Sequence, residues 1–432
     1  MEAVIIAGGK GTRLASMTKE IPKPMIPIGG KPILQYQIEE FRKNGVVDII
    51  ITVGYLKEVI QEYFGDGKNF GVNIRYVEED MPLGSAGAFY QVKKLVHGTF
   101  FVVYGDVLFS IDIKRMLKSH SKQGNEATLF AHPNSHPYDS DIVLHDDEHH
   151  VIGFLSKKED RSKIFYHNCV NAGFFVVDKE ALEYFQKPQK LDFEKDFLKW
   201  LANKHKLSVY VSTEYIKDMG TYDRLDAVGE NLKRGIVKQR NLKNPQKCIF
   251  LDRDGTLNVL NGFIVNPDQL HLENGAAEAV RSINESGYLA IVITNQPVIA
   301  RGMCTLKELD RINMKLEMLL GEKGAYIDAL YYCPHHPDKG YEGERPEYKI
   351  SCKCRKPGTA LIELAAKNYN ISLEDSWFIG DSTLDVKAGE NAGMKTILLK
   401  TGEGGMDRKY DIVPDKICNN LEEAVGYILK QG

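Results

Sequence analysis

The sequence predicts two α/β domains in series, and three observations support this fold class. The chain has 432 residues, more than a single hydrophobic core usually supports. Short apolar runs alternate with amphipathic helical stretches along its whole length. Near the middle, the basic and weakly periodic segment 233–246 interrupts this alternation, and a new apolar run follows at once.

The expected strands are short and apolar on both faces, as in the centre of a parallel sheet. They cover residues 3–8, 48–54, 99–106, 248–254, 289–295 and 376–381. Between them the pattern predicts helices over 32–44, 86–95, 275–286, 305–320 and 358–368. Strand–helix alternation in both halves favours a Rossmann-like sheet in each. We place the domains at 1–235 and 246–432, with the cut near Asn244.

The composition indicates a cytoplasmic protein that acts on small molecules. The formal net charge of −3 offers no general attraction to nucleic acid or anionic membranes. No apolar run approaches the roughly 18 residues that span a bilayer, and the N-terminus lacks the layout of a signal peptide. The seven cysteines are odd in number, and three of them crowd beside histidines, which favours a metal site over disulfides. A homo-oligomer is compatible with this composition.

The first expected strand runs into a glycine-rich loop with two cationic residues. Glycines let backbone N–H groups approach phosphates closely, and cationic side chains add charge-assisted hydrogen bonds. A plain tight turn is the alternative. Further on, Pro22 and Pro24 flank Lys23 and fix the local backbone that carries its ammonium group. The loop residues are Gly8, Gly9, Lys10, Gly11, Thr12 and Arg13.

The motifs GGKGTRL at 8–14 and PKPM at 22–25 resemble the signature of the sugar-nucleotide pyrophosphorylase family over roughly residues 1–232. The resemblance implies that Arg13 and Lys23 neutralise phosphates while a sugar 1-phosphate attacks the nucleotide. It also implies that the segment around Gly84 packs on the nucleoside. Two carboxylates, Asp106 and Asp218, would hold Mg²⁺. The sugar and its phosphate would contact Lys157, Gly173 and Glu194.

Two of these assignments have plain alternatives. Asp218 is also suited to cap a helix. Lys157 stands in Ser156-Lys157-Lys158, where many relatives carry Glu-Lys-Pro, and it could equally be a solvated surface residue. The missing acid leaves the identity of the sugar open.

The second half opens with Asp252 and Asp254 directly after the apolar run CIFL. Carboxylates at i and i+2 past a buried strand both reach a pocket at the sheet's carboxyl edge. One can attack phosphorus, while the other exchanges a proton with the leaving group. The alternative is that the two aspartates lie in a solvated turn without a catalytic role.

The DxDGT pattern resembles the haloacid dehalogenase superfamily, and Thr294, Lys356 and Asp381 follow in the order of its later motifs. The resemblance implies an aspartyl-phosphate on Asp252, acid–base work by Asp254, and stabilisation of the phosphoryl group by Thr294 and Lys356. Mg²⁺ would be held by Asp252, Asp381 and the backbone carbonyl of Asp254. Asp385 would orient this site rather than bind the metal.

Two clusters of soft ligands predict a closed, structural Zn²⁺ site. We assign Cys333, His335, Cys352 and Cys354 as ligands, with His336 competing for the histidine position. Reduced, buried cysteines without metal are the alternative. The zinc would fix the positions of Arg355 and Lys356, which follow directly.

The motifs DRDGTLN, TNQ, IARG, CPHHP and CxCRKP together resemble the D-glycero-D-manno-heptose-1,7-bisphosphate 7-phosphatases. That resemblance puts Asn295, Gln296, Arg301 and Arg355 around the substrate. This chain departs from the usual pattern at two places. Pro297-Val298 stands where relatives carry Ser-Gly, and Ser382 stands where relatives often carry lysine.

The two resemblances together predict a bifunctional enzyme. It would remove the 7-phosphate from heptose 1,7-bisphosphate and then couple the heptose 1-phosphate to a nucleotide. GTP is expected, because the first domain looks most like the guanylyltransferase branch. Three alternatives stay open. They are a mannose or hexose 1-phosphate nucleotidyltransferase joined to a broad sugar-phosphate or histidinol-phosphate phosphatase, a non-catalytic sugar-nucleotide-sensing first domain, and a first domain that serves only assembly.

Overall fold

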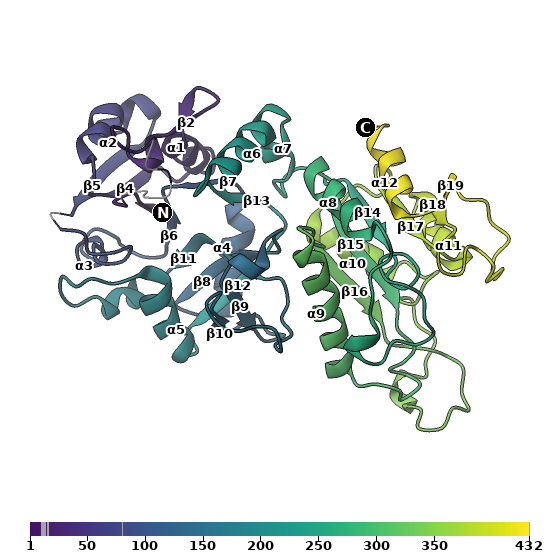
Figure 1. Cartoon of the computed structure of the whole chain (residues 1–432). Coiled ribbons are helices and arrows are strands. Elements are labelled where there is room, and N and C mark those ends of the chain that lie inside the picture. Colours follow the sequence, from purple (N-terminus) through teal and green to yellow (C-terminus); the bar gives the residue numbers. More distant parts are fainter. Residues whose placement is uncertain (10–13, 15–16, 80, 432) are drawn as a thin grey trace. The chain divides into compact units, whose positions relative to one another are not determined.

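The computed structural model describes residues 1–9, 14, 17–79 and 81–431, and these residues form two compact units (Figure 1). Unit 1 comprises Met1–His132, Val143–Leu155 and Asn171–Asn241. Unit 2 comprises Pro133–Ile142, Ser156–Val170 and Leu242–Gly432, so two short segments from the first half of the sequence group with it. Within unit 2, His167 lies between Glu317 and Asp310, at 2.9 and 3.0 Å.

Unit 1 is built on a nine-stranded mixed sheet whose main path runs β10-β9-β11-β6-β1-β4-β5. The central strands β1 (Glu2–Ile6), β4 (Asp48–Val53), β5 (Asn73–Glu78) and β6 (Phe100–Tyr104) are mutually parallel. β11 (Val170–Val177) joins β6 antiparallel. The other strands of this sheet are β8 (Ala127–His132), β9 (Ile142–His145), β10 (Val151–Leu155) and β12 (Leu207–Val211).

Helices α1 (Ile33–Lys43), α2 (Lys57–Phe64) and α4 (Ile113–Gln123) contribute apolar side chains to one core of this sheet. A short ribbon of β7 (Val107–Ser110) and β13 (Tyr215–Asp218) stands beside it. Unit 1 also contains α3 (Phe89–Val92), α5 (Lys199–Asn203), α6 (Tyr222–Lys233), α7 (Ile236–Gln239) and the hairpin of β2 (Pro27–Ile28) and β3 (Lys31–Pro32).

The expected linker over 233–246 contains α7, which the weak periodicity did not predict. Ile236 and Val237 of this short helix are buried against Tyr215 and Met219. The segment therefore closes the core of unit 1 before the chain continues into unit 2.

Unit 2 has a six-stranded, entirely parallel sheet in the order β16-β15-β14-β17-β18-β19. Its strands cover Cys248–Leu251 (β14), Leu289–Asn295 (β15), Ala329–Cys333 (β16), Trp377–Gly380 (β17), Lys395–Leu399 (β18) and Lys416–Cys418 (β19). The predicted buried strands 248–254, 289–295 and 376–381 thus become the three central ones.

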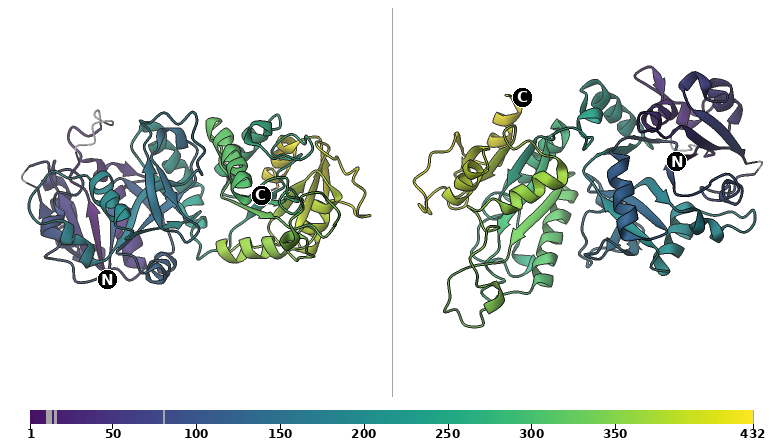
Figure 2. Two further views of the ribbon diagram at one scale, coloured as in Figure 1. Left: turned by 90° about the horizontal axis from the view of Figure 1, so that it is seen from below. Right: turned by 180° about the vertical axis from the view of Figure 1, so that it is seen from behind.

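Helices cover both faces of this sheet because successive strand residues point to opposite sides (Figure 2). Ile249 and Leu251 pack towards α8 (Ala276–Ser286), α9 (Leu306–Glu322) and α12 (Leu421–Leu429). Cys248 and Phe250 pack towards α10 (Ala360–Tyr369) and α11 (Thr383–Asn391). Burial on both faces explains why these strands are uniformly apolar.

Candidate active sites

The first candidate site lies where β14, β15 and β17 end in unit 2. Asp252 follows β14, Thr294 stands near the end of β15, and Asp381 follows β17. Carboxyl ends of parallel strands meet at one sheet edge, so residues distant in sequence gather there. The carboxylates of Asp252, Asp381 and Asp385 each offer an oxygen atom within 4.8 Å of the others.

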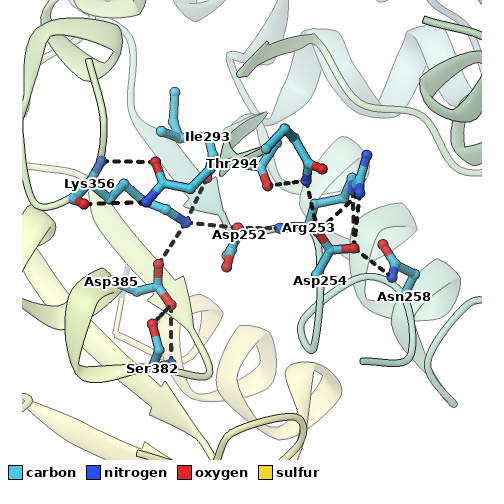
Figure 3. Close-up of polar contacts among 11 residues, drawn as sticks. Asp252, Arg253, Asp254, Asn258, Ile293, Thr294, Lys356, Ser382 and Asp385 are labelled. Atoms are coloured by element: carbon cyan, nitrogen blue, oxygen red, sulfur yellow. Dashed lines mark hydrogen bonds and ion pairs between the residues drawn. The ribbon is translucent and has the colours of Figure 1, made fainter. Parts of the chain in front are cut away.

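Lys356 binds this carboxylate cluster from one side. Its Nζ lies 2.7 Å from Asp252 Oδ1 and 2.6 Å from Asp385 Oδ1, and it also donates to the Ile293 carbonyl at 2.9 Å (Figure 3). The ammonium group is almost fully buried. Lys356 is therefore fixed beside the predicted nucleophile, as the motif order implied.

Asp385 and Asp381 are held in different ways. Asp385 Oδ2 accepts hydrogen bonds from Ser382 N and Ser382 Oγ at 3.1 and 2.6 Å. With Lys356 on its other oxygen, Asp385 serves the helix cap and the lysine, which agrees with an orienting role. Asp381 Oδ2 accepts from Glu403 N at 2.7 Å. A Cβ atom at Gly255 would lie 2.2 Å from that oxygen, so only glycine allows this close approach.

Burial of these groups changes their proton affinity. Burial raises the pKa of Asp252 to about 7, with Lys356 opposing and Asp385 adding to the shift. Burial, followed by repulsion from Asp385 and Asp252, raises the pKa of Asp381 to about 8. Clustered carboxylates of this kind are stabilised by a hard divalent cation, which prefers oxygen ligands. The donor set therefore fits such a cation.

Asp254 has a different environment two residues away. Its carboxylate accepts from Asn258 Nδ2 at 3.0 Å and Gln296 Nε2 at 2.8 Å, and it pairs with Arg253 at 3.0 Å. Burial alone would raise the pKa of Asp254, but Arg253, Asn258 and Gln296 outweigh it and lower the pKa below its ordinary value. These contacts favour the carboxylate form of Asp254, the form that can accept a proton from water.

Arg253 and Asn258 are residues that the sequence reasoning missed. Arg253 is fully buried, and its Nη1 donates to Asn313 Oδ1 at 3.1 Å. A charged residue between the two motif aspartates, directly after a buried strand, was the available signal, since a buried arginine requires an acidic partner.

Of the predicted substrate residues, Asn295 and Gln296 contact the catalytic residues, and Arg301 and Arg355 lie on other segments. Asn295 exchanges hydrogen bonds with the Lys356 backbone at 2.9 and 3.2 Å, so it orients the lysine segment. Gln296 Nε2 also donates to Thr294 Oγ1 at 3.0 Å. Arg301 lies at the end of the turn after β15, and Arg355 Nη1 donates to the His335 carbonyl at 3.3 Å. Val298 is buried in a small apolar cluster with Ile299 and Leu309.

The predicted cysteine–histidine site is assembled in the structure. Ligand atoms of Cys333, His335, Cys352 and Cys354 lie within 4.8 Å of one another. The Sγ–Sγ distances are 3.2 to 3.5 Å, close to the separation of about 3.8 Å that tetrahedral Zn–S bonds produce. His336 accepts from Asp338 N at 3.2 Å through Nδ1, and His335 is the histidine whose ring lies with the three cysteines.

The second candidate site lies in unit 1, around the end of β6. Lys23 Nζ forms an ion pair with Asp106 Oδ2. Met219 N donates to the Asp106 carbonyl at 3.0 Å, which brings the end of β13 with Asp218 to the same place. The Arg224 guanidinium binds both oxygens of Asp218 at 2.8 Å.

One arginine and one lysine favour the ionised form of Asp218. Burial alone would raise the pKa of Asp218, but Arg224 and, more weakly, Lys23 lower it below its ordinary value. Asp218 does not cap α6, because Thr221 is the N-cap residue and accepts from Arg224 N. The helix-capping alternative is therefore wrong.

Glycines shape the predicted nucleotide loops. Gly8 and Gly9 follow β1, and a Cβ atom at Gly8 would lie 2.8 Å from Glu79 Oε2. Gly84 has φ of +79°, and a Cβ atom there would lie 2.3 Å from the Leu191 carbonyl oxygen. Gly11, Thr12 and Arg13 lie outside the described residues.

The predicted sugar residues Gly173 and Glu194 are both linked to Tyr104 in unit 1. A Cβ atom at Gly173 would lie 2.6 Å from the Tyr104 ring. Burial raises the pKa of Tyr104, and Glu194 adds to the shift through charge and a hydrogen bond. Lys157 belongs to unit 2, where its Nζ lies 3.3 Å from Asp139 Oδ1 in an exposed ion pair.

The fold and these sites define a two-part α/β enzyme that acts on phosphate esters. A family model described as nucleotidyl transferase matches residues 2–234, more than half of the chain, so the chain belongs to the nucleotidyl transferase family. A second model, described as HAD-hydrolase-like, matches residues 353–424. The chain therefore joins a nucleotidyltransferase to a phosphatase.

Individual relatives resemble one part or the other. The chain is 35% identical to the D-glycero-β-D-manno-heptose-1,7-bisphosphate 7-phosphatase of Haemophilus ducreyi over 185 residues, 42% of this chain and 98% of the relative. A similar phosphatase from Chlorobaculum tepidum is 37% identical over 194 residues, 43% of this chain and 96% of the relative. The D-glycero-α-D-manno-heptose 1-phosphate guanylyltransferase of Campylobacter jejuni is 33% identical over 220 residues, 51% of this chain and 95% of the relative.

Proposed function

We propose that the chain catalyses two consecutive steps of nucleotide-activated heptose synthesis. The phosphatase removes the 7-phosphate from D-glycero-D-manno-heptose 1,7-bisphosphate. The nucleotidyltransferase then couples the resulting heptose 1-phosphate to GTP, giving GDP-heptose and pyrophosphate.

The observation that carries this proposal is the presence of both sites in one chain. Relatives of one part act on a heptose bisphosphate, and relatives of the other part act on heptose 1-phosphate. The product of the first reaction is thus the substrate of the second. Neither part alone would favour heptose over other sugars as strongly.

For the phosphatase, an Asp252 oxygen attacks phosphorus, and the sugar O7 leaves with a proton from the protonated form of Asp254, which becomes a carboxylate. Water, deprotonated by Asp254, then attacks the aspartyl-phosphate and releases orthophosphate. Lys356 and Thr294 stabilise the transferred phosphoryl group. Asp252, Asp381 and the Asp254 carbonyl would hold Mg²⁺, which supplies charge neutralisation. The buried ammonium between two carboxylates supports this assignment.

For the nucleotidyltransferase, a phosphate oxygen of heptose 1-phosphate attacks the α-phosphorus of GTP, and pyrophosphate leaves. Arg13 and Lys23 would neutralise the phosphates, while Asp106 and Asp218 would hold Mg²⁺. The loop residues Gly8, Gly9, Gly11 and Thr12 would bind the triphosphate, and Gly84 the nucleoside. Gly173 and Glu194 would contact the sugar. The Lys23–Asp106 ion pair supports this grouping.

The cysteine–histidine site would hold Zn²⁺ as a structural ion. Its four ligands leave no open coordination position for chemistry. The last ligand, Cys354, directly precedes Arg355 and Lys356 in the sequence. Metal binding would therefore fix the segment that carries the catalytic lysine.

Incubation of the purified chain with heptose 1,7-bisphosphate and each of the four NTPs, in separate α and β anomers, tests the proposal. The relatives' names differ in anomer, but one chain must use the same anomer at both sites to complete the sequence. We expect GDP-heptose, orthophosphate and pyrophosphate in equal amounts from one anomer. Absence of any NDP-heptose would refute the coupled pathway, and faster turnover of mannose 1-phosphate would assign the hexose alternative.

A further inference from the structure

An arginine packed between aromatic rings stands beside the phosphatase site. The Arg301 guanidinium carbon lies 4.6 Å from the ring centroid of Phe263 and 4.5 Å from that of Tyr341. Both rings remain well exposed, at 41% and 38%. Core packing does not account for two exposed aromatic side chains that meet on one cation.

Arg301 has no carboxylate within ion-pair distance among residues 1–9, 14, 17–79 and 81–431. Lys349 approaches the Tyr341 ring to 4.5 Å, and Glu344 pairs with that lysine at 3.3 Å. Glu344 is thus engaged by Lys349, whose side chain is almost fully buried. Arg301 keeps its positive charge available for an anionic ligand.

Three segments of the catalytic site meet at this arginine. Phe263 lies a few residues after Asn258, and Arg301 a few residues after Gln296; both Asn258 and Gln296 bind Asp254. Tyr341 belongs to the loop that connects the two halves of the cysteine–histidine site and leads to Lys356. A backbone hydrogen bond from Arg345 N to the Ala300 carbonyl, at 3.0 Å, ties this loop to the turn that carries Arg301.

We infer that Phe263 and Tyr341 are positioning residues that hold Arg301 for the phosphate of the substrate that is not hydrolysed. This inference rests on the proposed function, because only a bisphosphate has a second phosphate. Rings packed on a guanidinium occupy its faces and restrict its rotation. Arg301 Nη2 also donates to the Tyr341 hydroxyl at 3.4 Å, and the other in-plane N–H groups remain for a phosphate. The two aromatic residues thereby select a sugar bisphosphate over a monophosphate.

The test uses two substrates that differ only at C1, heptose 1,7-bisphosphate and heptose 7-phosphate. We expect Tyr341→Leu and Phe263→Leu each to raise KM for the bisphosphate roughly fivefold, the loss corresponding to one cation–π contact, with little change in kcat. KM for heptose 7-phosphate should stay the same in both variants. Tyr341→Phe keeps the ring but removes the hydroxyl to which Arg301 Nη2 donates at 3.4 Å, and wild-type KM values in this variant would assign the positioning to the ring face.

Ile350→Ala, an exposed change on the same loop, controls for loop disturbance, and zinc content and thermal unfolding are measured for every variant. Equal KM changes for both substrates, or no change for either, would overturn the positioning role. A wild-type enzyme that does not prefer the bisphosphate would instead count against the proposed function. The two failures are therefore distinguishable.

Discussion

Asp252 and Asp254 stand two residues apart, yet their surroundings move their carboxyl pKa values in opposite directions. Burial and neighbouring carboxylates raise the pKa of Asp252, while Arg253, Asn258 and Gln296 lower that of Asp254 against its burial. A divalent cation bound by Asp252 and Asp381 would lower the pKa of Asp252 and so supply the ionised nucleophile.

Asp254→Asn should trap the phosphorylated enzyme when the leaving group needs no proton. With p-nitrophenyl phosphate, phosphorylation of Asp252 proceeds, but water is no longer deprotonated, so turnover falls about a hundredfold or more. Intact-protein mass spectrometry should show one added phosphoryl group. Its absence in a variant that still releases p-nitrophenol at once would contradict the role of Asp254.

The protein without Mg²⁺ should lose stability as the pH rises. The folded-state pKa values of Asp252 and Asp381, about 7 and about 8, exceed the ordinary value of 3.8, so folding favours their protonated forms. That contribution is present at low pH and is lost as pH rises through the folded pKa values. In buffer without Mg²⁺ and with Zn²⁺ retained, the melting temperature should fall between about pH 4 and about pH 8, and excess Mg²⁺ should restore it. A flat profile would contradict the buried cluster.

The positions of single residues can be foreseen where a motif places them at a strand end. Asp252, Asp254 and Asp381 follow buried strands and Thr294 lies near the end of one, so parallel topology brings them to one sheet edge. Pairing partners were harder to foresee. Arg224 on Asp218 and Asp139 on Lys157 depend on how separate segments fold back, which spacing along the chain does not encode.

The loop between Cys333 and Cys354 shows how an element without helix or sheet pairing is held in place. Only a short 3-10 turn at Pro346–Tyr348 interrupts it, and its two ends meet in the cysteine–histidine cluster. A metal bound at that cluster would hold the two ends of the loop together.

His335→Ala should remove zinc and phosphatase activity together, whereas His336→Ala should retain both. His335 Nδ1 lies 3.2 Å from Cys354 Sγ, while His336 faces Asp338. Metal analysis of the two variants, with a phosphatase assay in parallel, checks this pair. Zinc loss in His336→Ala alone would reverse the assignment.

The length of a helix differs from its predicted length where long-range contacts fix the neighbouring turn. The helix expected over 86–95 is reduced to Phe89–Val92, because Ala86 N donates to the Leu191 carbonyl at 3.0 Å and Gly84 takes a left-handed conformation. The partner segment lies about a hundred residues away, so no local pattern announces it. Strongly periodic helices such as α8 and α9 were located within a few residues.

At the scale of the whole molecule, each unit has its own sheet and its own carboxylates. Asp252→Asn should lower orthophosphate release by roughly three orders of magnitude or more and leave nucleotidyl transfer to supplied heptose 1-phosphate intact. Lys23→Ala should lower nucleotidyl transfer on the order of a hundredfold and leave the phosphatase unchanged. Lys43→Ala, an exposed lysine of unit 1, serves as the matched control. Loss of both activities from either change would contradict independent sites.

One observation at this scale was not foreseen. Segments Pro133–Ile142 and Ser156–Val170 precede the expected domain cut, yet they group with unit 2. His167 contacts two acidic residues of α9, and their charge, acting against burial, raises the pKa of this histidine to about 11. A change in composition along the chain can indicate a domain boundary. It does not indicate that a short segment within one domain groups with the other.

Because both catalytic centres lie in one polypeptide, their ratio is fixed at one to one. Every translated chain contributes one hydrolytic centre and one centre that consumes its product, so expression level cannot alter their ratio. Balance between the two steps must then reside in the turnover rates and affinities themselves, and selection on either centre constrains the other.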